Sequence, residues 1–134
     1  MNSFPLKIVT PDGLRFDGIA EELIVRTTTG DLGILAGHIN LVAPLGMGQA
    51  MIRSAGEIRY GACIGGMVCI INGTVTLVPT TFEWADHVDA KRAEMAEIRA
   101  KKILDDKNST DEQIALAKAG LKRALIRKSV ASRK

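Results

Sequence analysis

Aromatic residues, cysteine and proline are scarce in this chain of 134 residues, and their distribution is uneven. Aromatic side chains make up 4% of the residues, and none follows Trp84. All four prolines, and every glycine except Gly120, lie before residue 88. Since proline and glycine disfavour helix interiors, the chain divides near residues 83–88 into a turn-rich first segment and a second segment that suits helices.

Two further absences exclude whole classes of protein. Cys63 and Cys69 are too few for a disulfide framework and lack Cys-x-x-Cys spacing, so we expect free, buried thiols. No apolar run reaches the ~20 residues that cross a membrane. Residues 1–10 contain one lysine and an early Pro5, without the charged and apolar regions of a signal peptide, which predicts a soluble cytoplasmic protein.

Charge divides the chain at the same place. Residues 1–87 carry five basic and eight acidic side chains, whereas residues 88–134 carry thirteen basic and seven acidic ones. The net charges are therefore −3 and +6, which indicates two physically different units. We predict two domains, residues 1–84 and residues 85–134.

The first segment has the pattern of a β-sandwich. Turn residues recur about every 8–18 positions, and short runs rich in β-branched side chains lie between them. Asn72-Gly73 separates two such runs, and both positions suit the positive φ angles of a tight hairpin. No ten-residue helical pattern interrupts the runs, which excludes a parallel βαβ fold. We predict an antiparallel β-sandwich over about residues 1–82.

The second segment predicts an antiparallel hairpin of two helices. The first helix spans Asp89 to about Asp106, and the second follows Thr110, which has Gln113 three residues later as a capping box. Each predicted helix has a stripe of apolar residues along one face. These residues are Ala93, Ala96, Ala100, Ile103 and Leu104 on the first helix and Ile114, Ala117, Leu121 and Ala124 on the second. Because alanine buries little apolar area, we expect the packing of the hairpin to be marginally stable. The hairpin should therefore be able to separate from the surface on which it packs.

The residues contain no recognisable active site. The chain lacks a Gly-x-x-x-x-Gly-Lys-Ser/Thr phosphate loop, and no paired carboxylates or nucleophile–base set stands out. His38 and His87 are the only histidines, which favours a structural or interface role over a metal or catalytic one. We predict a non-enzymatic protein without a metal site and without a permanently bound cofactor.

Three stretches together resemble the epsilon subunit of bacterial and chloroplast F-type ATP synthases. They are Thr10-Pro11-Asp12-Gly13, the run Gly30-Asp31-Leu32-Gly33-Ile34-Leu35-Ala36-Gly37-His38, and Leu121-Lys122-Arg123-Ala124 with Arg127 and Ser129-Val130-Ala131. The resemblance covers essentially the whole chain, with both segments in the family's order. One departure is Ala36, where the family commonly has proline.

The resemblance implies a place in a rotary complex. In the family, the sandwich lies at the foot of the central stalk and contacts the gamma subunit and the polar loops of the membrane c-ring. We place much of this contact in the loop from Thr29 to His38, with Asp31, Leu32 and His38 as interface residues. The implied location is the cytoplasmic face of the cell inner membrane, peripheral and reached only through the complex.

The resemblance also implies a regulatory ATP site at the helices. The family's nucleotide-binding pattern matches Glu83, Val88, Asp89, Arg92, Ala93, Arg99, Arg123 and Arg127. Helical spacing places Arg92 and Arg99 on one face, and a turn near Asn108 would set Arg92 level with Ala124. Guanidinium groups with few acids nearby would then converge on an anion such as a triphosphate. The alternative interpretation is a solvated basic face.

By the same resemblance, the hairpin opens, extends into the α/β catalytic ring and inhibits ATP hydrolysis. Lys118, Lys122 and Lys128, together with the neighbouring arginines, would meet acidic segments of the β subunits. Two functions of other classes stay open, a stand-alone adenine-nucleotide sensor and a basic nucleic-acid-binding module. The absence of aromatic residues after Trp84 removes base-stacking surfaces and weighs against nucleic acid as a partner.

Overall fold

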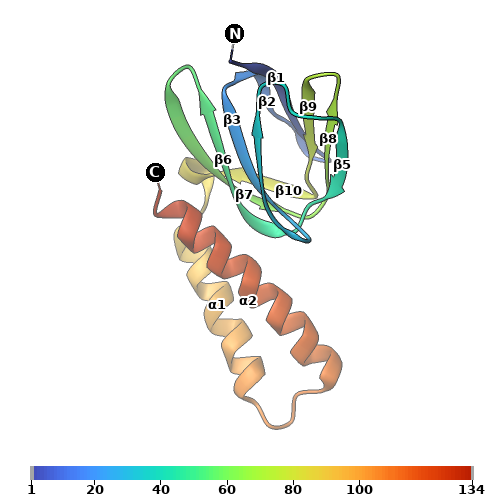
Figure 1. Cartoon of the computed structure of the whole chain (residues 1–134). Coiled ribbons are helices and arrows are strands. Elements are labelled where there is room, and N and C mark those ends of the chain that lie inside the picture. Colours follow the sequence, from blue (N-terminus) through green and yellow to red (C-terminus); the bar gives the residue numbers. More distant parts are fainter. Residues whose placement is uncertain (1, 134) are drawn as a thin grey trace.

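The computed structural model describes residues 2–133 and shows a β-sandwich with a helical hairpin below it (Figure 1). The strands are β1 (Phe4–Thr10), β2 (Gly13–Ala20), β3 (Glu22–Thr27), β4 (Gly30–Leu35), β5 (Leu41–Pro44), β6 (Met47–Ser54), β7 (Glu57–Ile64), β8 (Met67–Ile71), β9 (Thr74–Val78) and β10 (Thr81–Trp84). The helices are the 3-10 turn η1 (Ala85–His87), α1 (Ala90–Asp105) and α2 (Asp111–Ala131). The strand orders are β2-β1-β9-β8-β5 in the first sheet and β10-β7-β6-β3-β4 in the second.

The sandwich prediction is confirmed, with one difference in strand direction. Asn72 and Gly73, with φ angles of 50° and 82°, join β8 and β9 as an antiparallel hairpin. In contrast, β1 pairs with β9 in parallel, and Leu6 lies beside Val75. A tight turn forces its two strands to run antiparallel, but no turn joins β1 to β9, so the sequence pattern left their relative direction open.

The inner faces of the two sheets meet in one aliphatic core, and aromatic side chains close it at β10. Phe82 and Trp84 pack edge to face, with ring centroids 4.9 Å apart. Gly61 on β7 lies directly under Phe82, and a Cβ at this position would overlap the Phe82 ring. The core therefore extends to the point where the chain leaves the sandwich.

Both cysteines are free thiols, as predicted, but only one of them is buried. Burial raises the pKa of Cys63 to about 12, so this thiol is protonated at neutral pH and unreactive. Cys69 is half-buried because it points to the outer face of β8, opposite Val42 of β5.

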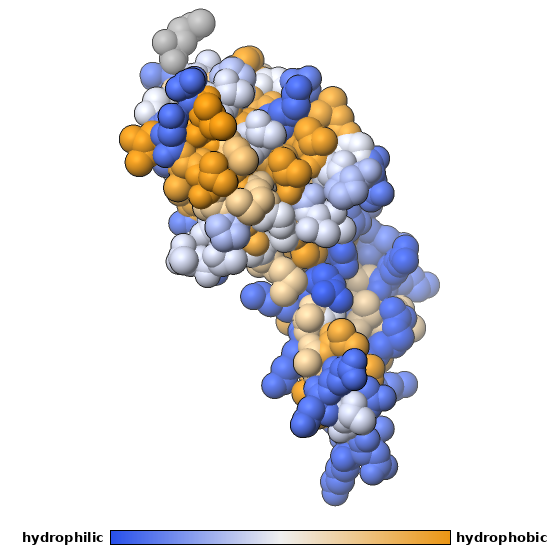
Figure 2. Space-filling view, turned by 90° about the vertical axis from the view of Figure 1, so that its right-hand side faces the viewer, coloured by the Kyte–Doolittle hydropathy of each residue, from blue (hydrophilic) through white to orange (hydrophobic). Residues whose placement is uncertain are grey.

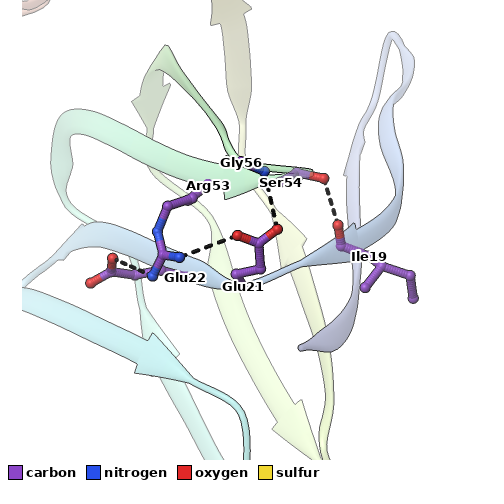
Figure 3. Close-up of polar contacts among 6 residues, drawn as sticks. All are labelled: Ile19, Glu21, Glu22, Arg53, Ser54 and Gly56. Carbon is purple, nitrogen blue, oxygen red and sulfur yellow. Dashed lines mark hydrogen bonds and ion pairs between the residues drawn. The ribbon is translucent and has the colours of Figure 1, made fainter. Parts of the chain in front are cut away.

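Polar contacts hold the two sheets together at the end of the sandwich far from the helices (Figure 3). Arg53 on β6 donates to Glu21 at 3.2 Å and to Glu22 at 3.1 Å. The Ser54 hydroxyl donates to the Ile19 carbonyl of β2 at 2.6 Å. The Ser54 contact ties β2 of the first sheet to β6 of the second, and Arg53 joins β6 to the neighbouring strand β3 and to the connection before it.

Both helices begin at side-chain caps, of which the sequence analysis predicted the one at Thr110. Asp89 caps α1, and its Oδ1 accepts from the Arg92 backbone N–H at 3.0 Å. Thr110 and Gln113 form the reciprocal capping box of α2, with distances of 2.8 and 3.1 Å. A polar loop around Asn108 separates the helices and allows them to run antiparallel.

The two helices pack on each other mainly through alanine. The buried alanines between the helices are Ala93 and Ala100 on α1 and Ala117 and Ala124 on α2, whereas Ala131 is buried against the sheet. Ile103, which we placed in the stripe, is 40% exposed, since it lies in the last turn of α1 beside the solvated loop. Little apolar area is therefore buried between the helices.

The last turns of α2 seat the hairpin on the outer face of the second sheet. There α2 packs against β6 and β7, and Val130 lies in a small apolar cluster with Ala62 and Val88. The Arg133 guanidinium stacks over Tyr60, 4.7 Å from the ring centroid. We refer to this arrangement, with α1 on α2 and α2 on the sheet, as the closed conformation.

Candidate functional site

A cavity of about 470 Å³ lies where α1, α2 and the end of β10 meet, and we call it the hairpin cavity. Its lining residues are Glu83, His87, Asp89, Arg92, Ala93, Ala96, Arg99, Ala124 and Arg127. Six of the eight residues that the sequence assigned to ATP are among them. The closed conformation thus brings most of the predicted set to one place.

The local structure of α1 explains how one wall of the hairpin cavity forms. Arg92, Ala96 and Arg99 follow one another at spacings of four and three residues, which places them on one helix face. The side chains of Ala93, Ala96 and Ala124 are short, so the space between the helices stays open. Within residues 2–133, neither Arg92 nor Arg99 forms an ion pair, and both charges are available to an anion.

An ion pair between the sandwich and α2 crosses the hairpin cavity. The Arg127 Nε donates to the Glu83 carboxylate at 2.8 Å, and the two side chains are 29% and 38% exposed. We expected few acids near the converging guanidinium groups, but Glu83 already engages one of them. This pair also links β10 to α2, so it forms only when the hairpin is packed against the sandwich.

Two residues of the predicted ATP set do not line the cavity. Val88 is 4% exposed and packs in the cluster under α2, where it supports the seat of the hairpin. Arg123 precedes Ala124 by one residue on α2, and a helix turns by about 100° per residue, so its side chain leaves the helix beside the cavity. His87, by contrast, lines the cavity without having been predicted, because a single 3-10 turn has no recognisable sequence pattern.

A carboxylate inside the helix interface was also missed. The Glu97 side chain is 12% exposed and accepts from Lys101 at 2.8 Å and from Lys128 at 2.7 Å. These hydrogen bonds, first from Lys101 and then from Lys128, lower the pKa of Glu97 from 4.5 to about 2. The Glu97 carboxylate in turn raises the pKa of Lys128. Glu97 follows Ala93 by four residues, so a charged side chain within the alanine stripe was the available signal.

The three lysines that we expected to meet the β subunits differ in this conformation. Lys118 and Lys122 are exposed on α2, whereas Lys128 is bound to Glu97 across the helix interface. Lys128 would have to leave Glu97 before it met another subunit.

The predicted interface residues of the sandwich lie on β4, the edge strand of the second sheet, and in the loop after it. Asp31 is exposed and pairs with Arg26 at 2.8 Å, so part of its charge is satisfied within the chain. Leu32 is partly buried and packs against the core. The His38 Nδ1 lies 2.8 Å from the Ile39 carbonyl oxygen.

The outer face of the first sheet is apolar, which the sequence analysis did not anticipate. Met67 and Val78 are paired across β8 and β9, and with Val42 and Ile71 they are 39–57% exposed. Figure 2 shows hydrophobic side chains gathered over the sandwich, in contrast to the hydrophilic helices. The unbroken apolar run of β8 was the signal, since such runs are typical of strands covered on both faces.

The chain matches known proteins along its whole length. Residues 3–85 match the family model of the ATP synthase delta/epsilon chain β-sandwich domain. The chain is 41% identical to the ATP synthase epsilon chain of Ruminococcus albus and 37% identical to that of Bacillus cytotoxicus, with 100% of both chains covered in each case. The chain therefore belongs to the ATP synthase epsilon chain family. Epsilon chains are non-catalytic subunits of ATP synthase, which confirms that this chain is not itself an enzyme.

Solved structures share the fold. A chain of the Euglena gracilis mitochondrial ATP synthase OSCP/F1/c-ring structure matches with a TM-score of 0.81 and 17% identity, over 96% of this chain and 80% of that one. A chain of the Tetrahymena thermophila mitochondrial ATP synthase central stalk/c-ring structure matches with a TM-score of 0.65 and 16% identity, over 95% of both. Within residues 2–133, neither helix is long and apolar enough to cross a membrane.

Replacing Glu97 with glutamine should destabilise the closed hairpin at neutral pH, because Lys101 and Lys128 lose a charged acceptor. The stabilisation by Glu97 is complete above its ordinary pKa of 4.5 and is lost as the pH falls toward about 2. Urea unfolding of the wild type and Glu97→Gln from neutral pH to acid pH measures the difference in free energy. This difference should shrink below pH 4.5.

The control is Glu94→Gln, which removes an exposed carboxylate from the same helix. It should change the free energy of unfolding much less than Glu97→Gln at neutral pH. A difference between the wild type and Glu97→Gln that stays constant over the whole pH range would contradict the role assigned to the carboxylate.

Proposed function

We propose that this chain is a rotor subunit of an F-type ATP synthase, which couples the catalytic head to the c-ring and inhibits ATP hydrolysis through its helices. The match to epsilon chains over the full length supports membership in that complex. In this function the chain lies peripherally on the cytoplasmic face of the cell inner membrane. It is held there by its protein partners rather than by lipid.

The sandwich provides the contacts with the rest of the rotor. An exposed apolar face is costly in water and is typical of a protein interface, which supports assigning the face with Val42, Met67 and Ile71 to the gamma subunit. The edge with Asp31 and His38 carries polar groups beside the exposed side chains of Leu35 and Ile39, and we assign it to the polar loops of the c-ring. The two surfaces lie on different sheets, so one sandwich can contact both partners.

The helical hairpin provides the regulation. Its alanine interface buries little apolar area, so the free energy that opposes opening is small. Lys118 and Lys122 are exposed already in the closed conformation, and opening of the hairpin would release Lys128 from Glu97. An extended basic helix of this kind would enter the α/β catalytic ring and pair with acidic segments. Each exposed pair contributes about 0.2–1 kcal/mol, so inhibition depends on the whole set.

ATP is the ligand that we assign to the hairpin cavity, and the cavity is the observation that carries this assignment. Its volume of about 470 Å³ lies within the range of about 300–1,000 Å³ usual for small-ligand sites. Arg92 and Arg99 are unpaired arginines within residues 2–133 and suit the phosphates through charge-assisted hydrogen bonds. Asp89 and Glu83 are acceptors for the amino group of adenine or the ribose hydroxyls.

ATP in this cavity would favour the closed conformation. The lining residues come from β10, α1 and α2, so opening of the hairpin separates them and destroys the site. A ligand that binds one of two states shifts their balance by its differential affinity. At a hundredfold excess over the dissociation constant the shift is about 2.7 kcal/mol. Abundant ATP would thus keep the hairpin closed, and scarce ATP would allow inhibition.

Arg92→Ala should weaken ATP binding at least about tenfold, because it removes a charge-assisted hydrogen bond to phosphate. The matched control is Lys102→Ala, which removes the same charge from an exposed position of α1 outside the cavity. Calorimetric titration of ATP into the isolated wild-type chain and into each variant measures the three affinities. Equal affinities for the wild type and both variants, or no binding by the wild type, would remove the nucleotide site and leave the rotor function intact.

Deletion of residues 88–134 should raise ATP hydrolysis by the reconstituted ATP synthase several-fold, because the inhibitory helices are gone. The rate is compared with that of the complex containing the full chain, at equal occupancy of the subunit. Replacement of Lys118 and Lys122 by alanine should raise it less, since only part of the charge set is lost. Unchanged hydrolysis after the deletion would rule out the inhibitory role.

A further inference from the structure

A second cavity, of about 420 Å³, adjoins the hairpin cavity at the end of the sandwich. It lies between β2 and β10, the edge strands of the two sheets, and its wall includes Arg15, Arg59 and Trp84. Glu83 and His87 line both cavities and form the boundary between them. We call this second space the sandwich cavity.

One hydrogen bond positions the Arg15 side chain in the wall of the cavity, and a second holds its backbone on β2. Its Nε donates to the Phe82 carbonyl at 3.3 Å, and its own carbonyl accepts from the Trp84 indole N–H at 3.0 Å. Arginine has five N–H donors, and the Nε bond occupies one of them. The terminal groups of the guanidinium are left free to meet a ligand.

Arg59 on β7 is held flat against the tryptophan. Its guanidinium carbon lies 3.7 Å from the centroid of the Trp84 ring, which is a close cation–π contact. All the N–H donors of a guanidinium lie in its own plane. Stacking therefore uses the face of Arg59 and leaves the donors along its edge unoccupied.

The two charges of the sandwich cavity are not neutralised within the chain. Within residues 2–133, neither Arg15 nor Arg59 forms an ion pair with a carboxylate. Glu83 is the acidic residue in the wall, but its carboxylate is held by Arg127 at 2.8 Å on the side of the hairpin cavity. Two positioned guanidinium groups in one concave space are an arrangement that favours a bound anion.

We propose that Arg15 and Arg59 form a second anion site, which binds a phosphate group. A carboxylate has two oxygens in one plane, whereas a phosphate presents oxygens in several directions and can accept from two guanidinium groups on different strands. Both arginines belong to the sandwich, so inorganic phosphate can bind here without a nucleotide in the hairpin cavity. The phosphate is either free inorganic phosphate or the terminal phosphate of a nucleotide that crosses the boundary at Glu83 and His87.

Trp84 provides a direct readout, because it is the single tryptophan of the chain and Arg59 lies on its ring. Titration of inorganic phosphate at constant ionic strength should change Trp84 fluorescence in a saturable way, and calorimetry should give the same affinity. Arg59→Gln and Arg15→Gln should each weaken binding at least about tenfold. Arg26→Gln is the matched control, since it removes an exposed arginine of the sandwich outside the cavity.

Further variants distinguish inorganic phosphate from the phosphate of a nucleotide, and the sandwich cavity from the hairpin cavity. Arg92→Ala should lose ATP affinity and keep the response to inorganic phosphate, which shows that the sites are independent. If Trp84 responds to ATP but not to inorganic phosphate, and Arg59→Gln abolishes that response, the phosphate comes from the nucleotide.

Calorimetry keeps the test valid for variants in which the environment of Trp84 has changed. Arg59→Lys retains the charge but lacks the planar fork, so it should bind phosphate with an affinity between those of the wild type and Arg59→Gln. Circular dichroism verifies that each variant is folded. The proposal is overturned if neither phosphate nor ATP binding changes on replacement of Arg15 and Arg59 in folded variants.

Discussion

The helices of this protein meet through alanine side chains, and this limits how much apolar surface the closed conformation can bury. The fully buried apolar side chains of this seam are alanines, and Leu104, Ile114 and Leu121 are only half-buried. The seam therefore gains little from burial, and a few charged contacts weigh heavily in the balance. Glu97 joins the two helices through Lys128, and Glu83 joins the sandwich to α2 through Arg127. The closed hairpin therefore depends on ion pairs that cross its interfaces, supported by the small cluster around Val130.

This arrangement would allow a small ligand to control the opening of the hairpin, as proposed above. The same short side chains that weaken the interface leave the hairpin cavity open between the helices, and the arginines in its wall add charge that an anion offsets. The sandwich, in contrast, is held together by a continuous core and by the polar contacts around Arg53 and Ser54 (Figure 3). The structure thus combines a well-packed sandwich with a helical hairpin whose interfaces bury little apolar area, and the proposed rotor function requires both.

Much of the fold followed from the sequence because local patterns determine it. The Asn72-Gly73 turn and the cap at Thr110 define their elements through nearest neighbours, and the structure has both. The parallel pairing of β1 with β9 could not be predicted, since it joins strands that no turn connects. At the site, helical spacing brought Arg92 and Arg99 together. The pairing of Glu97 with Lys128 and the stacking of Arg59 on Trp84 depend on tertiary packing, and neither partner can be read from the local sequence.

The central claim is that charged contacts, rather than apolar burial, keep the hairpin closed. The reference protein carries Cys63→Ala and Cys69→Ser, so that it has no native cysteine. Lys91→Cys on α1 and Lys122→Cys on α2, two exposed positions, then carry spin labels that report the distance between the helices. Pulsed electron resonance then compares the distribution of label-to-label distances in this background with that in the same protein carrying Glu83→Gln and Glu97→Gln. The account predicts one short distance in the background and an additional, longer population in the double variant. A single short distance in both proteins would contradict it.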